Sequence, residues 1–545
     1  MSRTPRPRSM QAPQPATTTT ARVSRAVTLS WAIAGVAATA YYLGWLLDGD
    51  RVGFVPLFAL LVIADAFNGF HALSFWATCL RRPKKRPFDV AISAARPRVD
   101  VFVPTYNEPV DIVAQTLTAA RAMRGADVRV YLLDDGRRPE MAALAASLGA
   151  DYLARATNAG AKSGNINHAL EVTRDGGADY IAVFDCDHVP QRGFLERTLG
   201  YFDDARLGMV QTPQVYGNVG AGALTAGSSQ QQEIFFGPIC QGRDGFDSAF
   251  CCGTNFVVRR EALDEAGGFP EDSITEDIVL STTLVGLGWD ISFLAEPLTA
   301  GLGPEDAKSY VSQQLRWATG CIDLLFKRPQ VWKPLSWVQR WQYFVATSYW
   351  LSGWTIIAYL TMPVAVLLFG LQPVNADGLQ FVQHFLPYFL ISIVNLGRFT
   401  VGGYGISGLA MNWGSFPIHI RATVRVLTGR VGGFAVTSKE ALAGSPWKPF
   451  RANIAIAVGL LVVIAIGLAR TGLTAPTVNN AAFALLNGGL VVMIVGLAAN
   501  QARAVRRSAA IPQAANEPRL EPLALVAERA PAEEPHTARV MAAHR

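Results

Sequence analysis

Charged residues are scarce in this chain: only 17% of its 545 residues are Asp, Glu, Lys or Arg, whereas 50% are hydrophobic. A soluble protein usually has about 25% charged residues, so the composition argues against an ordinary cytosolic enzyme. The large hydrophobic share also excludes intrinsic disorder for the body of the chain. The formal charge of +6 is compatible with nucleic acid as a partner, but the basic residues flank apolar runs. We therefore expect a membrane protein with no nucleic-acid partner.

Cysteine is also rare, and no spacing of the six cysteines resembles a zinc site. They are Cys79, Cys186, Cys240, Cys251, Cys252 and Cys321. All are expected on the cytoplasmic side or at its boundary, where a reducing compartment disfavours disulfides. The glycine-containing loop around Lys162 lacks the Walker A pattern. The sequence therefore predicts no zinc site, disulfide scaffold or Walker A loop.

Long runs with few or no charges are present instead. Each run exceeds or approaches the roughly 20 residues with which a helix crosses the hydrocarbon core of a bilayer. They lie at 26–47, 52–80, 341–370, 378–397, 453–469 and 478–499. No comparable run lies between the second and the third of them. The pattern predicts two membrane helices, a soluble insert and then four more membrane helices.

The basic residues indicate the orientation of this multi-pass protein. Arg and Lys cluster before the first run, after the second and after the last, whereas the short connections within the pairs contain only Arg51 and Arg470. Positively charged loops stay on the cytoplasmic side of a membrane. We therefore expect both termini and the insert in the cytoplasm, and the chain in the inner or plasma membrane.

One further uncharged segment, 399–420, is long enough for a seventh span. Four glycines and Pro417 interrupt it, and a seventh span would place the basic residues that follow it outside the cell. We expect an amphipathic segment along the inner interface instead. The two ends of the chain, rich in Pro, Ala, Thr and Arg, are expected to be disordered.

The soluble insert alternates short apolar runs with helical patterns. Runs 99–103, 128–133 and 180–184 have the composition of strands, and helix-like stretches separate them. This alternation predicts an α/β domain with a mostly parallel sheet. Ligands of such sheets bind beyond the carboxyl ends of the strands, so we expect the polar groups that follow the three runs to meet at one edge.

Those polar groups have both a functional and an ordinary interpretation. They are Tyr106 and Glu108 after the first run, Asp134 and Asp135 after the second, and Asp185, Asp187 and His188 after the third. Two carboxylates in an Asp-x-Asp pattern suit a divalent cation that substrate phosphates also hold. Acidic turns, an Asp-Gly turn and a surface histidine would explain the same residues without a function. Lys162 can neutralise a phosphate, or it is a solvated lysine.

A second acidic pattern, Ser273-Ile-Thr275-Glu276-Asp277, opens a helix expected at 277–286. In the functional interpretation, Asp277 is a general base for a hydroxyl nucleophile. In the ordinary one, Ser273 and Glu276 form a capping box at the start of the helix.

The pattern Gln313-Gln-Leu-Arg316-Trp317 lies on an amphipathic stretch before the third membrane run. Its three key side chains fall on neighbouring helical positions. Such a patch can hold a diphosphate through Arg316 and stack a sugar ring on Trp317. Alternatively, the same two residues anchor the helix at the membrane surface.

Taken together, in this order and at this spacing, these motifs resemble the processive membrane glycosyltransferases of family 2, of the cellulose synthase type. The resemblance covers most of residues 98–340 and the arrangement of two and four spans. Two further motifs extend it. The sequence Phe434-Ala-Val436-Thr437-Ser-Lys439 is similar to the gating loop that closes over the nucleotide sugar, and segment 250–254 is similar to the family's acceptor-lining segment.

The resemblance implies a role for each matched residue. Tyr106, Glu108 and Asp135 would hold the uridine, with Asp134 as a further substrate-binding residue, and Lys162 and Arg316 would contact the diphosphate. Cys252, Gln313 and Trp317 would border the acceptor sugar, and Phe434, Val436, Thr437 and Lys439 would close over the donor. Asp185, Asp187 and His188 would hold Mg²⁺ or Mn²⁺. Asp277 would be the catalytic base, next to Thr275 and Glu276 in the same motif.

The resemblance also implies a GT-A type fold for the insert and a UDP-sugar-dependent hexosyltransferase activity. The implied reaction polymerises a β-glucan like cellulose from UDP-glucose at the cytosolic face and moves it across the lipid bilayer, with accessory secretion subunits as possible partners. Three alternatives stay open: a chitin- or hyaluronan-type synthase that uses UDP-N-acetylglucosamine, a glucan synthase with another linkage, and an inactive polysaccharide channel. No cyclic-di-GMP-binding domain is recognisable, so regulation by that nucleotide is not expected.

The expected organisation is a membrane protein that carries its transferase domain as an insert. Its parts are a basic disordered N-terminus (1–25), two membrane helices (26–80), a GT-A domain (98–304), interfacial helices with the Gln-x-x-Arg-Trp motif (305–340), two membrane helices (341–402), an interfacial helix and gating loop (403–451), two membrane helices (452–500) and a disordered tail (501–545).

Overall fold

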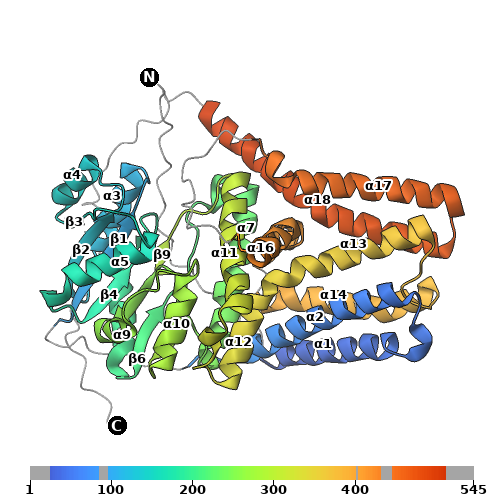
Figure 1. Cartoon of the computed structure of the whole chain (residues 1–545), viewed down its shortest axis with the longest axis horizontal. Coiled ribbons are helices and arrows are strands. Elements are labelled where there is room, and N and C mark those ends of the chain that lie inside the picture. The colour runs from blue at the N-terminus through green and yellow to red at the C-terminus, as the bar shows by residue number, and fades with distance from the viewer. Residues whose placement is uncertain (1–24, 85–95, 401–402, 431–444, 511–545) are drawn as a thin grey trace, which may run out of the picture. The chain divides into compact units, whose positions relative to one another are not determined.

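The structure is a computed structural model and describes residues 25–84, 96–400, 403–430 and 445–510 (Figure 1). Within this part of the chain, six helical segments are long and apolar enough to cross a membrane, which confirms the predicted number. Their helices are α1 (Arg25–Leu46), α2 (Val55–Leu80), α12 with α13 (Trp337–Ser348 and Ser352–Phe369), α14 (Gly378–Phe399), α17 (Arg451–Thr471) and α18 (Ala475–Ala510).

The last helix corrects one expectation. Residues 501–510 were assigned to a disordered tail, but α18 continues through them to Ala510. The reason is the composition of this stretch, which consists mainly of Ala, Gln and Arg. These residues are strong helix formers, so the helix does not stop where the apolar run stops. Expectations about residues 1–24 and 511–545 lie outside the described residues.

The segment that allowed a seventh span forms two short helices, α15 (Ile406–Gly414) and α16 (Phe416–Leu427). Neither is among the helices of the described ranges that are long enough to cross a membrane. The chain bends between them at Ser415, and Pro417 occupies the first turn of α16, where its missing N–H costs nothing. The position of these helices along the membrane interface stays a prediction.

The soluble insert is built on a seven-stranded sheet with the order β3-β2-β1-β4-β7-β6-β8. The strands are β1 (Arg98–Thr105), β2 (Asp127–Asp134), β3 (Asp151–Leu153), β4 (Tyr180–Val183), β6 (Leu207–Gln211), β7 (Phe256–Arg259) and β8 (Asp290–Phe293), and β5 (Val189–Pro190) pairs with β9 (Thr299–Ala300) in a small second sheet. Only β7 runs antiparallel to its neighbours in the large sheet, which confirms a mostly parallel α/β fold.

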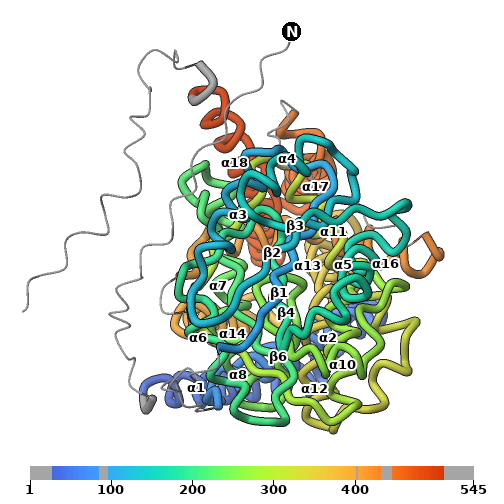
Figure 2. Tube along the Cα trace, turned by 90° about the vertical axis from the view of Figure 1, so that its left-hand side faces the viewer, coloured from blue at the N-terminus to red at the C-terminus, as the bar shows by residue number. Residues whose placement is uncertain are grey.

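Helices cover both faces of this sheet. They are α3 (Val110–Arg121), α4 (Pro139–Leu148), α5 (Ala161–Val172), α6 (Phe194–Thr198), α8 (Cys240–Gly245), α9 (Arg260–Ala266) and α10 (Glu276–Gly286). Two further helices of the insert, α7 (Ala223–Ile234) and α11 (Ala307–Lys327), pack against α15 and α16 instead. Figure 2 shows α3 and α5 on opposite sides of the strands.

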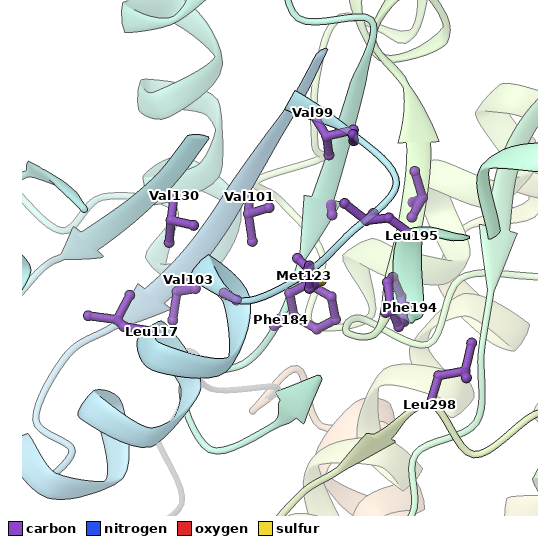
Figure 3. Close-up of a cluster of buried hydrophobic side chains, with 14 of the residues drawn as sticks. Val99, Val101, Val103, Leu117, Met123, Val130, Phe184, Phe194, Leu195 and Leu298 are labelled. Atoms are coloured by element: carbon purple, nitrogen blue, oxygen red, sulfur yellow. The ribbon is translucent and has the colours of Figure 1, made fainter. Parts of the chain in front are cut away.

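The alternation of side chains along β1 explains why both faces are covered. Val101 and Val103 point into one core, where Leu117 of α3 packs against the strand (Figure 3). Phe102 points to the other face and belongs to a second core with Ile166 of α5. Because successive strand residues alternate between faces, a run that is apolar throughout needs helices on both sides.

The insert is joined to the membrane helices through α8. An added Cβ on Gly242 would lie 1.9 Å from the carbonyl oxygen of Thr78 in α2, so only glycine allows this approach. The neighbouring Arg243 is fully buried between the rings of Phe250 and Tyr343. Helix α8 is therefore in backbone contact with the end of the second membrane helix.

This contact gives a first prediction. The substitution Gly242→Ala forces a methyl group into the Thr78 carbonyl, and overpacking of this kind typically costs about 1–3 kcal/mol. We expect a thermal midpoint several degrees below that of the wild type in detergent, measured by loss of the monodisperse fraction on heating. Gly220→Ala is the matched control, because an added Cβ there meets no atom within 4 Å. Equal midpoints for the two variants would contradict the proposed close contact.

Candidate active site

The segment after β4 gathers the first group of polar side chains. One ligand atom from each of Asp185, Asp187 and His188 lies within 4.8 Å of the others. The backbone N–H of Asp185 donates to Thr254 Oγ1 (2.8 Å), which fixes the start of the turn. His188 is buried, and its Nε2 has no hydrogen-bond partner among the described residues. Two carboxylates beside an imidazole form a donor set that fits Mg²⁺ or Mn²⁺.

Lys162 lies in the first turn of α5 and points to this group. Its Nζ forms an ion pair with Asp185 and donates to the carbonyl oxygen of Gly253 (2.7 Å). Burial alone would lower the pKa of Lys162, but Asp185 and Glu276 hold it above its ordinary value. Burial would likewise raise the pKa of Asp185, and Lys162 holds it below its ordinary value. The pair is therefore charged, with the Lys162 side chain mostly buried and that of Asp185 38% exposed.

Asp277 belongs to the same neighbourhood through Gly253. An added Cβ on Gly253 would lie 3.5 Å from Asp277 Oδ2, and Lys162 bonds the carbonyl of the same glycine. Burial, and then the adjacent Glu276, raise the pKa of Asp277 from its ordinary value of 3.8 to about 7, against the lowering effect of Lys162. A carboxyl group with this pKa can accept or release a proton near neutral pH.

The ordinary interpretation of this acidic pattern is wrong in one respect. Helix α10 begins at Glu276 with Thr275 as its N-cap, and no side chain caps it. The Ser273 hydroxyl instead accepts a hydrogen bond from the N–H of Thr275 (3.3 Å), so Ser273 and Glu276 do not form a capping box. The capping pattern fails because Ser273 lies two residues before the N-cap position rather than at it.

The segment around Cys252 is held by hydrogen bonds from both of its sides. The N–H of Cys252 donates to Gln211 Oε1 (2.7 Å), and its carbonyl oxygen accepts from Gln214 Nε2 (2.7 Å). The N–H of Cys251 donates to Ser281 Oγ (2.8 Å) in α10. The sequence analysis did not identify the two glutamines, because their role depends on β6 running beside β7.

Helix α11 carries Gln313, Arg316 and Trp317, and its first turn is capped by the side chain of Asp306. Arg316 lies near enough to Glu276 to lower the pKa of that carboxyl, although burial raises it overall. Gln313 Oε1 is buried without a hydrogen-bond partner among the described residues. The structure therefore brings the Gln-x-x-Arg-Trp motif beside the acidic start of α10.

A pocket of about 600 Å³ opens beside the ends of β1 and β2. Tyr106, Glu108 and Asp135 are among its lining residues. Arg155 holds Asp135 with two hydrogen bonds, 2.6 and 2.8 Å long, a contact that the sequence analysis did not predict. No sequence pattern distinguishes Arg155 from the other arginines of the insert, because the contact depends on the strand order.

Asp134 differs from its neighbour Asp135. It is fully buried, does not line the pocket, and accepts hydrogen bonds from the N–H groups of Gly136 and Arg138 and from the Tyr152 hydroxyl. Asp134 also pairs with the Arg138 side chain, which is in the pocket wall, so it positions that arginine. The expected gating residues Phe434, Val436, Thr437 and Lys439 lie outside the described residues.

Comparisons with known proteins agree with this arrangement. Residues 97–320 match the family model "Glycosyltransferase like family 2", and residues 264–416 match the family model "Cellulose synthase". Cellulose synthase 1 of Komagataeibacter xylinus is 36% identical over 359 residues, which are 64% of this chain and 23% of the relative. The cellulose synthase catalytic subunit [UDP-forming] of Pseudomonas fluorescens (strain SBW25) is 35% identical over 389 residues, 69% of this chain and 51% of the relative.

Among solved structures, the mannosyltransferase PcManGT from Pyrobaculum calidifontis, in complex with GDP-Man and Mn²⁺, has a TM-score of 0.49 and 17% identity over 69% of this chain and 99% of that chain. The sheet and the family matches define the insert as a GT-A type glycosyltransferase domain in a membrane protein. These matches support a cellulose synthase-like glycosyltransferase of family 2. It spans between 23% and 51% of the length of these two curated relatives.

The raised pKa of Asp277 gives a prediction about stability. Because the folded protein holds this proton more tightly than the unfolded chain, ionisation of Asp277 destabilises the fold as pH rises from 3.8 to about 7. The thermal midpoint of Asp277→Asn minus that of the wild type should therefore increase from pH 3.8 to about 7 and stay constant at higher pH. Thermal unfolding in detergent at a series of pH values measures the difference.

The exposed Asp175→Asn is the matched control, since it removes a carboxylate from the surface. Its difference from the wild type should not change with pH. If Asp277→Asn behaves in the same way, the carboxyl group of Asp277 is not held protonated by burial.

Proposed function

We propose that the protein is a processive, inverting glycosyltransferase that extends a cellulose-like β-glucan from a UDP-sugar and passes it across the membrane. The observation that carries this proposal is the meeting of Lys162 with Asp185 and with Gly253, the residue that adjoins Asp277. Phosphate-binding and proton-accepting groups are thus within reach of one substrate. The named relatives are cellulose synthases, one of them described as UDP-forming, which favours UDP-glucose as donor.

In the proposed reaction, Asp277 removes the proton from the acceptor hydroxyl while that oxygen attacks the anomeric carbon of the donor. The bond between this carbon and the diphosphate oxygen breaks in the same displacement, so an α-linked donor gives a β-linked product. A pKa of about 7 leaves a substantial fraction of Asp277 ionised at neutral pH and ready to accept the proton.

The leaving UDP gains negative charge as that bond breaks. Lys162 and Arg316 are the cations that would stabilise this charge, Lys162 from α5 and Arg316 from α11. Asp185, Asp187 and His188 would hold a divalent cation against the phosphate oxygens. When bound, such an ion supplies further positive charge to the leaving group.

The donor and the acceptor would bind on opposite sides of the cluster formed by these cations and carboxylates. The pocket beside Tyr106 and Asp135 offers a half-exposed ring and a carboxylate held by Arg155, which suit a nucleoside base and its polar edge. Trp317 would stack the acceptor sugar, with Cys252 and Gln313 beside it. The membrane helices would then conduct the polymer away from the cytoplasmic side of an inner or plasma membrane, with or without accessory secretion subunits.

The donor and the product test this proposal together. Purified protein in vesicles is incubated with labelled UDP-glucose or, separately, with UDP-N-acetylglucosamine, and the product is digested with linkage-specific glycanases. We expect polymer from UDP-glucose that a β-1,4-glucanase degrades. Asp277→Asn should lower its formation by about 10²-fold or more, because a positioned base contributes about 10²–10⁴-fold.

UDP binding to Asp277→Asn should persist, and the exposed Asp175→Asn should keep full activity. If polymer formed only from UDP-N-acetylglucosamine, that nucleotide sugar and not UDP-glucose would be the donor. A single sugar added to a lipid would contradict processive synthesis, and unchanged synthesis by Asp277→Asn would remove Asp277 as the base.

The metal assignment has its own test. We expect EDTA to stop synthesis and Mg²⁺ or Mn²⁺ to restore it. Asp187→Asn should weaken Mn²⁺ binding by about tenfold or more, because it removes an anionic ligand, whereas Asp175→Asn should leave it unchanged. Electron paramagnetic resonance of free Mn²⁺ measures binding without any turnover. Synthesis that continues in EDTA, or unchanged Mn²⁺ affinity in Asp187→Asn, would contradict the assignment.

A further inference from the structure

An apolar groove of about 570 Å³ lies between the membrane helices and α16, outside the candidate active site. Its floor contains Ile357 of α13, Phe416 and Ile420 of α16, and Ile456 of α17. Helix α17 begins at Arg451, so Ile456 is less than two turns from the charged end of that membrane helix. The groove is therefore near one end of the membrane helices and not at their middle.

The rim of this groove is positively charged. Arg421, Arg425 and Arg430 are among its lining residues, and the lining contains no acidic residue. Arg421 and Arg430 are exposed and Arg425 is half-buried. None of the three forms an ion pair with a carboxylate in the described ranges of the chain, and the sequence from Phe416 to Arg430 contains no Asp or Glu.

The three arginines line the same groove, and no carboxylate of the described residues pairs with them. Arg421 and Arg425 are one helical turn apart on α16, and burial together with Arg421 lowers the pKa of Arg425. Like charges at this spacing destabilise an isolated helix. An anion above the apolar floor would relieve this repulsion, and guanidinium groups bind phosphate through two parallel hydrogen bonds.

We propose that this groove binds an anionic phospholipid of the cytoplasmic leaflet, with its phosphate on Arg421, Arg425 and Arg430 and an acyl chain along Ile357, Ile420 and Ile456. The ligand must have an apolar and an anionic part, because the floor is apolar and the rim is basic. Basic pockets between membrane helices on the cytoplasmic side are typical sites for anionic lipid headgroups. A soluble phosphate would use the rim and leave the floor in water.

The bound lipid would support the candidate active site indirectly. Helix α16 packs against α11, the helix that carries Arg316 and Trp317, in a shared core that includes Ala422 and Leu315. The hydroxyls of Tyr310 in α11 and Ser415, just before α16, are also hydrogen-bonded (2.8 Å). Neutralising the arginines on the outer side of α16 would stabilise this helix in its position. The proposal is independent of the sugar that the enzyme transfers.

The test uses the purified full chain, stripped of lipid in detergent and titrated with dioleoyl phosphatidylglycerol or dioleoyl phosphatidylcholine. Native mass spectrometry counts the bound lipids. We expect phosphatidylglycerol to bind about tenfold more tightly than phosphatidylcholine. The double variant Arg421→Gln/Arg425→Gln should lose this preference and keep its weak binding of phosphatidylcholine.

Two further variants separate a defined site from general attraction to charge. Arg503→Gln/Arg506→Gln removes the same number of charges elsewhere and should leave the preference for phosphatidylglycerol unchanged. Val424→Trp fills the groove from an exposed position without removing a charge, and it should weaken the binding of both lipids. Equal losses in both double variants, or full binding by Val424→Trp, would overturn the proposal.

A competition experiment distinguishes the lipid from a soluble anion. Glycerol 3-phosphate has the phosphate of the lipid without its chains, and we expect it to leave phosphatidylglycerol bound at equal concentration. Displacement at equal concentration would show that the rim alone recognises the ligand and would overturn the assignment to a lipid. The absence of any preference between the two lipids in the wild type would do the same.

Discussion

The candidate site depends on the placement of one cation among carboxylates that would otherwise repel each other. Asp185, Glu276 and Asp277 come from two distant parts of the chain; Glu276 is buried, and Asp185 and Asp277 are half-buried. Like charges in such a place favour protonation of one of the groups. Lys162 pairs with Asp185, which stays ionised, whereas Asp277 takes a pKa of about 7. One lysine thus leaves one carboxylate of the group charged and another able to take up a proton near neutral pH.

Much of this site could be predicted from the sequence, because parallel strands bring their carboxyl ends to one edge. That rule alone predicts that Glu108 and Asp135 lie at the same edge of the sheet as Asp185. The contacts between these residues were not predictable in the same way. Arg155 holds Asp135, and Gln211 supports Cys252, only because the strand order makes them neighbours. Strand order is a tertiary property, and no local pattern in the sequence encodes it.

Local sequence rules did not predict the start of α10 or the end of α18 correctly, because more than one rule applied to the same residues. The capping-box pattern of Ser273 and Glu276 has the correct spacing, but α10 begins at Glu276, so the N-cap position falls on Thr275 and not on Ser273. An added Cβ on Gly320 of α11 would lie 2.3 Å from the Thr275 side chain, so the two helices are in direct contact there. At the end of α18 the apolar pattern stopped before the helix did, because helix propensity does not require hydrophobic residues.

The same contact between α10 and α11 links the chemistry to the membrane. Asp277 lies in the first turn of α10, and Arg316 lies on α11, which leads through a short turn into α12 and the third membrane segment. Close packing transmits small displacements, because interiors of proteins have low compressibility. A shift of the third segment would therefore be passed to α11, which carries Arg316, and to the start of α10, which carries Asp277. In a processive enzyme, this coupling would allow the position of the polymer among the membrane helices to affect the next transfer.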